Sequence, residues 1–202
     1  MENLQEAFNY LNKDKVMCFL INKFSKNIQI NDRREANDSK SIANLIIEQQ
    51  VSFKAAITIK KRFNIMTKGL SNKQIIEMDE KKLQSIGISF KKAQYIKNVY
   101  NYFNDIDFDF QKLDENQIKD ELIKIKGIGK WTIEMYLIFI KGSQNIFSMG
   151  DLALINSIKI NYKINNLKKD SLKYLIDSWS PYKTVASLLL WKSIEEKVFY
   201  EG

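Results

Sequence analysis

Residues 122–132, LIKIKGIGKWT, decide the fold class. Apolar residues at helical spacing lie on both sides of a Gly-x-Gly turn, which predicts two helices, over residues 117–124 and 131–140, joined by a tight hairpin. Glycine lets backbone amides approach an anion with no Cβ in the way, and the same amides open the second helix, whose dipole favours negative charge. The hairpin therefore indicates a phosphate contact. Taken alone, it is equally an ordinary connection in which one residue needs a positive φ.

Helical spacing recurs along the rest of the chain. Further helices are expected over residues 79–85, 91–103, 152–160 and 183–196, and apolar residues spaced by three or four run from Ile42 to Ala56. One proline and seven glycines are too few for the turns of many strands. Residues 27–30 alternate as in one short strand. The sequence predicts an all-α fold.

Composition excludes several kinds of chemistry. The 202 residues include no histidine and one cysteine, Cys18, which removes histidine-based catalysis, cysteine-rich zinc sites and cysteine-ligated iron–sulfur clusters. Lys and Arg total 32 against 24 Asp and Glu, and the net charge of +8 favours a polyanionic partner. No apolar run approaches the roughly 20 residues of a membrane span. We expect an intracellular protein, in the cytoplasm and its nucleoid if the source is bacterial.

A second motif, FSMGDLAL at residues 147–154, places Asp151 after a glycine and at the start of an apolar helix. Aspartate is a favoured N-cap, and taken alone this is its more frequent role in such a place. A carboxylate at this position can also act as a general base or stabilise positive charge. The two roles can coexist on one side chain.

Three further stretches are ambiguous one by one. In IIEQQVSFKAA, residues 46–56, polar residues interrupt an apolar run, as on the solvated face of an amphipathic helix. In WSPYKTVASLLLW, residues 179–191, two tryptophans are core residues or surfaces against which a base stacks. The basic run from Lys54 to Lys68 is a solvated face or a phosphate-tracking one.

Together, in this order, the motifs resemble those of the helix–hairpin–helix DNA glycosylase superfamily, in its alkylated-base (3-methyladenine type II) branch. The likeness runs from Ser39 to Trp191, and its most specific part is GIGKWT followed, 22 residues after Gly129, by the aspartate of GDLAL. The resemblance implies a two-lobed helical fold with a central cleft. One lobe is expected at about residues 40–115. Residues 1–39 and 116–202 would form the other, with the helix–hairpin–helix (121–140) and the catalytic segment (147–155).

The resemblance also implies roles for individual residues. The catalytic residue would be Asp151. Contacts to the DNA backbone would come from Gly127, Gly129, Lys130 and Thr132. A monovalent cation, sodium or potassium, would be held by the carbonyls of Ile123, Ile125 and Ile128, with no other cofactor. The base pocket would be lined by Trp131, Met135 and Trp191. The wedge that fills the gap left by a flipped base would be Gln50.

The implied activity is that of a monomeric, monofunctional enzyme acting on double-stranded DNA. It would flip 3-methyladenine or 7-methylguanine, with hypoxanthine as a further candidate, and hydrolyse the N-glycosidic bond in base excision repair. Strand-cutting relatives carry a Schiff-base lysine where Trp131 stands, so lyase activity is not expected. Three alternatives stay open: a same-fold glycosylase for oxidised or deaminated bases, a non-catalytic DNA-binding module, and a helical adaptor. Whether Glu48, Glu134 or Tyr136 assists Asp151 is also open.

Overall fold

The computed structural model describes residues 4–29, 33–35, 37–164 and 168–202. Within these ranges the secondary structure is helical and contains no strand, which confirms the all-α prediction. The predicted strand at residues 27–30 is wrong over its described part, because Asn27 closes a 3-10 turn and the next two residues form no strand; Ile30 lies outside the described residues. In the described chain, no helix is both long enough and apolar enough to span a membrane.

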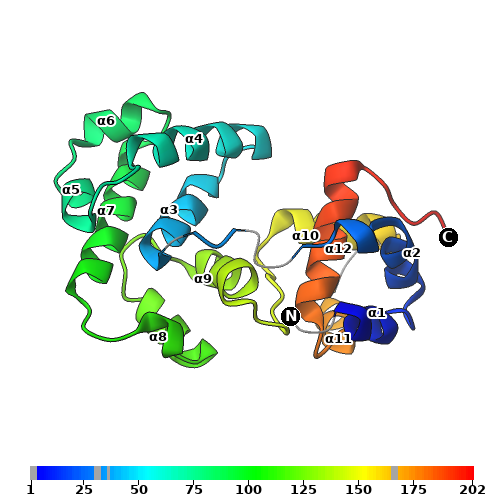
Figure 1. Cartoon of the computed structure of the whole chain (residues 1–202). Helices are drawn as coiled ribbons and strands as arrows, with labels where there is room; N and C mark the ends of the chain where they lie inside the picture. Colours follow the sequence, from blue (N-terminus) through cyan, green and yellow to red (C-terminus); the bar gives the residue numbers. More distant parts are fainter. Residues whose placement is uncertain (1–3, 30–32, 36, 165–167) are drawn as a thin grey trace. The chain divides into compact units, whose positions relative to one another are not determined.

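The chain divides into two compact units (Figure 1). Unit 1 comprises residues 1–32 and 137–202, and unit 2 comprises residues 33–136. This division differs from the expected one, because residues 121–136 of the helix–hairpin–helix belong to unit 2. The reason is packing: the helix after the hairpin lies against residues 38–48 and hydrogen-bonds to Asp38 and Gln49.

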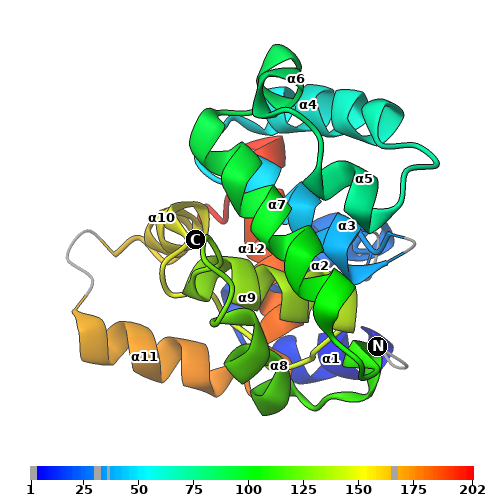
Figure 2. The ribbon, with the colours of Figure 1, turned by 90° about the vertical axis from the view of Figure 1, so that its left-hand side faces the viewer.

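Unit 2 is built around α3, whose residues 41–47 are all buried. Helix α7 packs along α3 and also against α5 and α6; Figure 2 shows it running across the face of this unit. Serine and aspartate side chains cap α5, α6, α7 and α8 by accepting hydrogen bonds from first-turn amides. The helices are α3 (Asp38–Glu48), α4 (Phe53–Met66), α5 (Asn72–Ile76), α6 (Glu80–Ser85), α7 (Phe90–Asp105), α8 (Glu115–Leu122) and α9 (Lys130–Tyr136).

The apolar periodicity from Ile42 to Ala56 does not form one helix. Helix α3 ends at Glu48, and α4 begins at Phe53 after its N-cap Ser52. Between them, Gln50 has a φ of +55°, a left-handed conformation that ends helical hydrogen bonding. The break leaves Gln50 and Val51 exposed at the end of a buried helix.

Unit 1 has a core of aliphatic and aromatic side chains from both of its chain segments, including Met17, Leu20, Trp179, Leu189 and Leu190. Helix α12 contacts α1, α2 and α10 within it. The helices are α1 (Leu4–Leu11), α2 (Lys15–Phe24), α10 (Leu152–Asn161), α11 (Lys169–Ser178) and α12 (Lys183–Glu196), with a π-helical turn at Leu137–Lys141.

Candidate functional site

The hairpin between α8 and α9 is held by its backbone. Ile128 N donates to Ile125 O at 3.0 Å, and Ile133 N donates to Gly129 O at 3.1 Å as α9 begins. Gly127 has a φ of +108°, and a Cβ at this position would lie 2.2 Å from Cγ of Tyr95, so glycine is required there. A Cβ on Gly129 would meet no atom within 4 Å. The hairpin is thus packed against the protein at Gly127 and open at Gly129.

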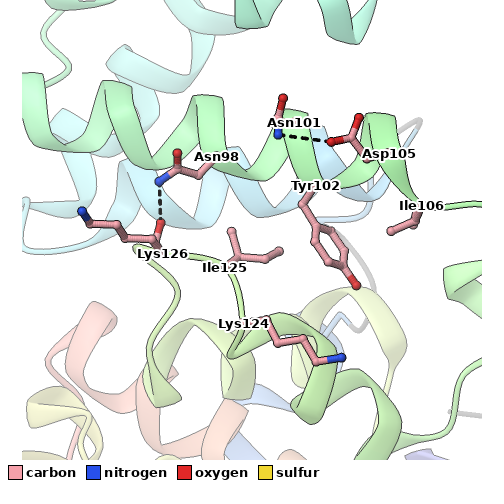
Figure 3. Close-up of a pocket in the computed structure, with 8 residues that line it drawn as sticks. All are labelled: Asn98, Asn101, Tyr102, Asp105, Ile106, Lys124, Ile125 and Lys126. Carbon is pink, nitrogen blue, oxygen red and sulfur yellow. Dashed lines mark hydrogen bonds between the residues drawn. The ribbon is translucent and has the colours of Figure 1, made fainter.

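Helix α7 supports the hairpin from one side. Figure 3 shows Asn98 Nδ2 donating to Lys126 O, at 3.0 Å, beside a pocket of about 400 Å³. Along the same helix, Tyr102 donates to Glu121 Oε2 at 2.6 Å, and Lys124 Nζ lies 2.7 Å from Glu121 Oε1. The Lys124 ammonium and the Tyr102 hydroxyl hold the pKa of the Glu121 carboxyl below its usual value. These contacts fix the hairpin backbone on a rigid helix.

Helix α9 carries four of the predicted site residues. Trp131 and Met135 are four residues apart and therefore share a face, with Trp131 half-buried and Met135 buried. Lys130 is exposed, with Nζ 3.8 Å from Glu134 Oε1. Thr132 points inward and is 1% exposed, and its Oγ1 accepts a hydrogen bond from Gln49 Nε2 at 2.8 Å. Thr132 can therefore offer a phosphate its backbone amide but not its side chain.

Three other residues of unit 2 considered above already have partners: Lys60, Glu48 and Tyr136. Lys60, in the basic run, pairs with Glu48, which also binds Arg33 at 2.8 Å. Tyr136 donates to Asp38 Oδ1 at 2.7 Å. Burial, and to a lesser extent this hydrogen bond, raises the pKa of the Tyr136 hydroxyl. Two of the residues considered as assistants to Asp151 are thus engaged elsewhere. The exposed lysines near or in α4 are Lys54, Lys61 and Lys68.

Asp151 is the N-cap of α10, as its position after a glycine predicts. Its Oδ1 accepts hydrogen bonds from Ala153 N at 3.0 Å and Leu154 N at 3.1 Å. The same oxygen accepts a third hydrogen bond from Trp191 Nε1 at 3.3 Å. The carboxylate is half-buried and is oriented by two amides and an indole.

The indole of Trp191 is itself fixed. Its ring stacks on Phe139, with centroids 5.5 Å apart and planes 30° from parallel. Phe139 belongs to the π-helical turn that follows α9 and begins the second chain segment of unit 1. The structure therefore brings Asp151 and Trp191 together, as two predicted site residues, and adds Phe139 to them.

A second aspartate in unit 1 repeats the arrangement at a different place. Asp14 caps α2 by accepting from Val16 N at 2.8 Å and Met17 N at 3.1 Å, and its Oδ2 accepts from Trp179 Nε1 at 3.4 Å. Tyr162 also donates to this oxygen, at 2.6 Å. Trp179 is 1% exposed and belongs to the core, whereas Trp191 is half-buried. The two pairs share one local chemistry, which makes Asp14 and Trp179 matched controls for Asp151 and Trp191.

The predicted site residues fall into two groups, one in each unit. Asp151 and Trp191 lie in unit 1, and the hairpin, Trp131, Met135 and Gln50 lie in unit 2. Sequence reasoning did not identify Phe139 or Tyr95, since both look like ordinary apolar residues of helices. Among the described residues, no group of three or more cysteine, aspartate or glutamate side chains is placed to hold a metal ion.

Comparison with known proteins assigns the chain to a family. The model of the HhH-GPD superfamily base excision DNA repair proteins matches residues 43–181. The Bacillus subtilis protein YfjP, provisionally named a DNA-3-methyladenine glycosylase, is 32% identical over 162 residues, which cover 74% of this chain and 56% of YfjP. The chain thus spans less than two thirds of the length of that relative.

Solved structures share the fold. The Schizosaccharomyces pombe 3-methyladenine DNA glycosylase Mag1, in complex with abasic DNA, matches with a TM-score of 0.86 at 22% identity, over 95% of this chain and 97% of Mag1. A Bacillus halodurans DNA-3-methyladenine glycosidase matches with a TM-score of 0.72 at 28% identity, over 98% of this chain and 93% of that one. Since the family model matches more than half of its residues, the chain belongs to the HhH-GPD superfamily of base excision DNA repair proteins.

Proposed function

We propose that the protein is a monofunctional DNA glycosylase of the 3-methyladenine type. It binds duplex DNA as a monomer, flips an alkylated purine out of the helix and hydrolyses the N-glycosidic bond, as a first step of base excision repair. The proposed substrates are 3-methyladenine and 7-methylguanine, with hypoxanthine third. The family assignment and the names given to YfjP and Mag1 support this proposal.

One observation carries the proposal: the Asp151 carboxylate is held at a helix N-terminus by two amides and the Trp191 indole. Cleavage of an N-glycosidic bond passes through a transition state with positive charge on the sugar, as in other glycoside hydrolysis. A fixed carboxylate stabilises that charge and accepts a proton from the attacking water. An alkylated purine is cationic and leaves readily, so its departure needs no general acid.

Recognition of the base is assigned to aromatic side chains. The indoles of Trp131 and Trp191 can stack on an electron-poor base, a cation–π contact that favours alkylated over normal purines. Met135 shares a helix face with Trp131 and is the third residue assigned to base recognition. Because Trp131 has no amine, a Schiff base with the sugar is not available at this position. We therefore expect base release without strand cleavage.

Binding of the DNA backbone is assigned to the hairpin. The open side of Gly129, the amides that begin α9 and Lys130 suit a phosphate. A monovalent cation fits the same turn, since the carbonyls of Ile123 and Ile125 follow the last turn of α8, at the negative end of its dipole. Ile125 O accepts one hydrogen bond, from Ile128 N, and a carbonyl oxygen has two lone pairs. Bound with Ile128 O as third ligand, sodium or potassium would add positive charge facing the phosphate.

The function is tested by incubating the protein with duplex DNA treated with a methylating agent and identifying the free bases by mass. We expect 3-methyladenine and 7-methylguanine in solution and intact strands until alkali is added. Strand breaks without alkali would contradict a monofunctional enzyme. Duplexes with oxidised or deaminated bases are assayed in parallel. Release from these alone would favour the same-fold alternative, and binding with no release from any duplex would favour a binding module.

Trp191→Phe is expected to slow base release about tenfold, because the variant keeps a ring on Phe139 but loses the indole donor that orients Asp151. The measurement is the single-turnover rate of release from methylated duplex. Trp179→Phe is the matched control: it removes an indole donor from Asp14 in the same unit and should lower stability while leaving the rate within about twofold of wild type. Equal rates for Trp191→Phe and wild type would remove the indole from the mechanism.

A further inference from the structure

The C-terminal end of α3 is held by a lysine from another helix. Lys92 Nζ donates to Ile47 O at 2.9 Å and also to Gln49 O. Lys92 lies in the first turn of α7, where that helix's own dipole disfavours a positive charge. Burial further lowers the pKa of its ammonium. Both costs are offset by the carbonyls that end α3, which the ammonium satisfies and whose dipole it complements.

Gln49, whose backbone carbonyl accepts from Lys92, is also hydrogen-bonded to α9 through its side chain. Gln49 Nε2 donates to Thr132 Oγ1 at 2.8 Å, and Thr132 is buried. Helix α9 begins at Lys130, directly after the hairpin glycines. Gln49 is therefore anchored at two points, and one of these lies in the first turn of the helix that the hairpin opens.

The next residue, Gln50, is the proposed wedge. It is exposed and has a φ of +55°, a left-handed conformation that costs a non-glycine residue about 1–2 kcal/mol. Such a conformation persists where the neighbouring structure over-determines it. Here the preceding residue is clamped by Lys92 and Thr132, and two residues later Ser52 Oγ accepts from Ala55 N to start α4. The exposed Gln50 side chain therefore lies on a short segment that is fixed on both sides.

We propose that Lys92 is a positioning residue for base flipping: together with Thr132 it clamps Gln49 and sets the Gln50 wedge in register with the phosphate-binding hairpin. The inference rests on the proposed function. A flipped nucleotide leaves a gap at a fixed distance from the phosphate that the protein grips. A wedge tied to the start of α9 is already positioned to enter that gap. Misplacing the wedge by about 1 Å lowers the rate of base release, although no contact to the reacting atoms is lost.

The test compares Lys92→Met with wild type on two duplexes. Each carries one methylated purine that the wild type releases, either opposite its normal partner or opposite an abasic-site analogue. Lys92→Met should slow release about tenfold from the paired duplex and less than about twofold from the unpaired one. The reason is that an unpaired base breaks fewer interactions when it leaves the stack. A purely structural loss would slow both duplexes equally.

Lys97→Met is the matched control. Lys97 lies on the same helix and its Nζ donates to Glu80 Oε1 at 2.9 Å, but that contact does not involve α3. Its removal should leave the ratio of the two rates unchanged. Gln50→Gly keeps the left-handed backbone and removes the wedge, so it should show the same dependence on the opposite base. The double variant Lys92→Met/Gln50→Gly should be no slower than Gln50→Gly alone.

Thermal unfolding of each variant shows whether it is folded at the assay temperature. Should Lys92→Met unfold, Thr132→Val carries the test, since it removes the acceptor of Gln49 without changing the side-chain shape. Equal loss on both duplexes, or additive losses in the double variant, overturns the positioning role while leaving the proposed function standing. A wild type that releases no methylated base from either duplex contradicts the proposed function, and with it the wedge.

Discussion

Asp151→Asn lowers the rate of methylated-base release by about 10²–10³-fold while the protein stays folded: this is the largest effect on activity that we expect. The substitution removes the negative charge and keeps an oxygen at the same place. Asparagine caps helices as well as aspartate, so Ala153 N, Leu154 N and the Trp191 indole retain an acceptor. The measurement is release of free base under single-turnover conditions, together with thermal unfolding.

Asp14→Asn is the control for this experiment, because Asp14 also caps a helix and accepts from an indole. The control should lose about 1–2 kcal/mol of stability, through its contact with Tyr162, and keep the wild-type release rate. Undiminished release by Asp151→Asn would remove the carboxylate from the mechanism. A loss shared by both variants would point to damage of unit 1 as a whole.

Gly127→Ala is expected to have the largest effect on stability, a loss of about 2–4 kcal/mol. The backbone at this position has a φ of +108°, and the new methyl group would overlap the Tyr95 ring, with its Cβ 2.2 Å from Cγ. Neither the strain nor the overlap can be relieved without moving the hairpin away from α7. Urea unfolding measures the change in the free energy of unfolding.

Gly129→Ala separates the structural glycine from the exposed one. Its Cβ would meet no atom of the protein within 4 Å, so the free energy of unfolding should change by less than about 1 kcal/mol. The methyl group would instead stand on the face assigned to the phosphate, so DNA affinity should fall. Equal stability of the two alanine variants would refute the packing role of Gly127.

Helices with strong local signals could be predicted from the sequence. Residues 183–196 coincide with α12, and the expected helix at 152–160 differs from α10 by one residue. Both are rich in apolar residues, and Pro181 shortly precedes α12 while the N-cap Asp151 precedes α10. Helices α1, α2, α5 and α11 were not identified. They have five to ten residues each, too few to be stable without tertiary packing, although α1, α2 and α11 carry amphipathic patterns that the sequence does contain. The boundary between the units depends on packing of distant segments and has no local signal.

The candidate site was predictable where a motif carries its own chemistry. Asp151 and the hairpin glycines follow from residue type and position, and the structure adds their partners. Nothing in the sequence distinguishes Lys92, because a sequence does not tell a lysine that covers helix carbonyls from one that faces solvent. Thr132 was assigned to the DNA backbone by its place in GIGKWT, and its side chain turns inward toward Gln49. Both differences are tertiary in origin.

The order of the two units along the chain has a consequence for biosynthesis. Helices α1 and α2 leave the ribosome before unit 2, yet their partner α12 is made only after the whole of unit 2. Closing the intervening loop costs about 4 kcal/mol of chain entropy, which only the completed core of unit 1 can repay. Unit 2 is contiguous and needs no later residue for its own contacts. A nascent chain halted within α11 therefore contains all of unit 2, including the hairpin. The segment that bears Asp151 still lacks α12, which completes the core of unit 1.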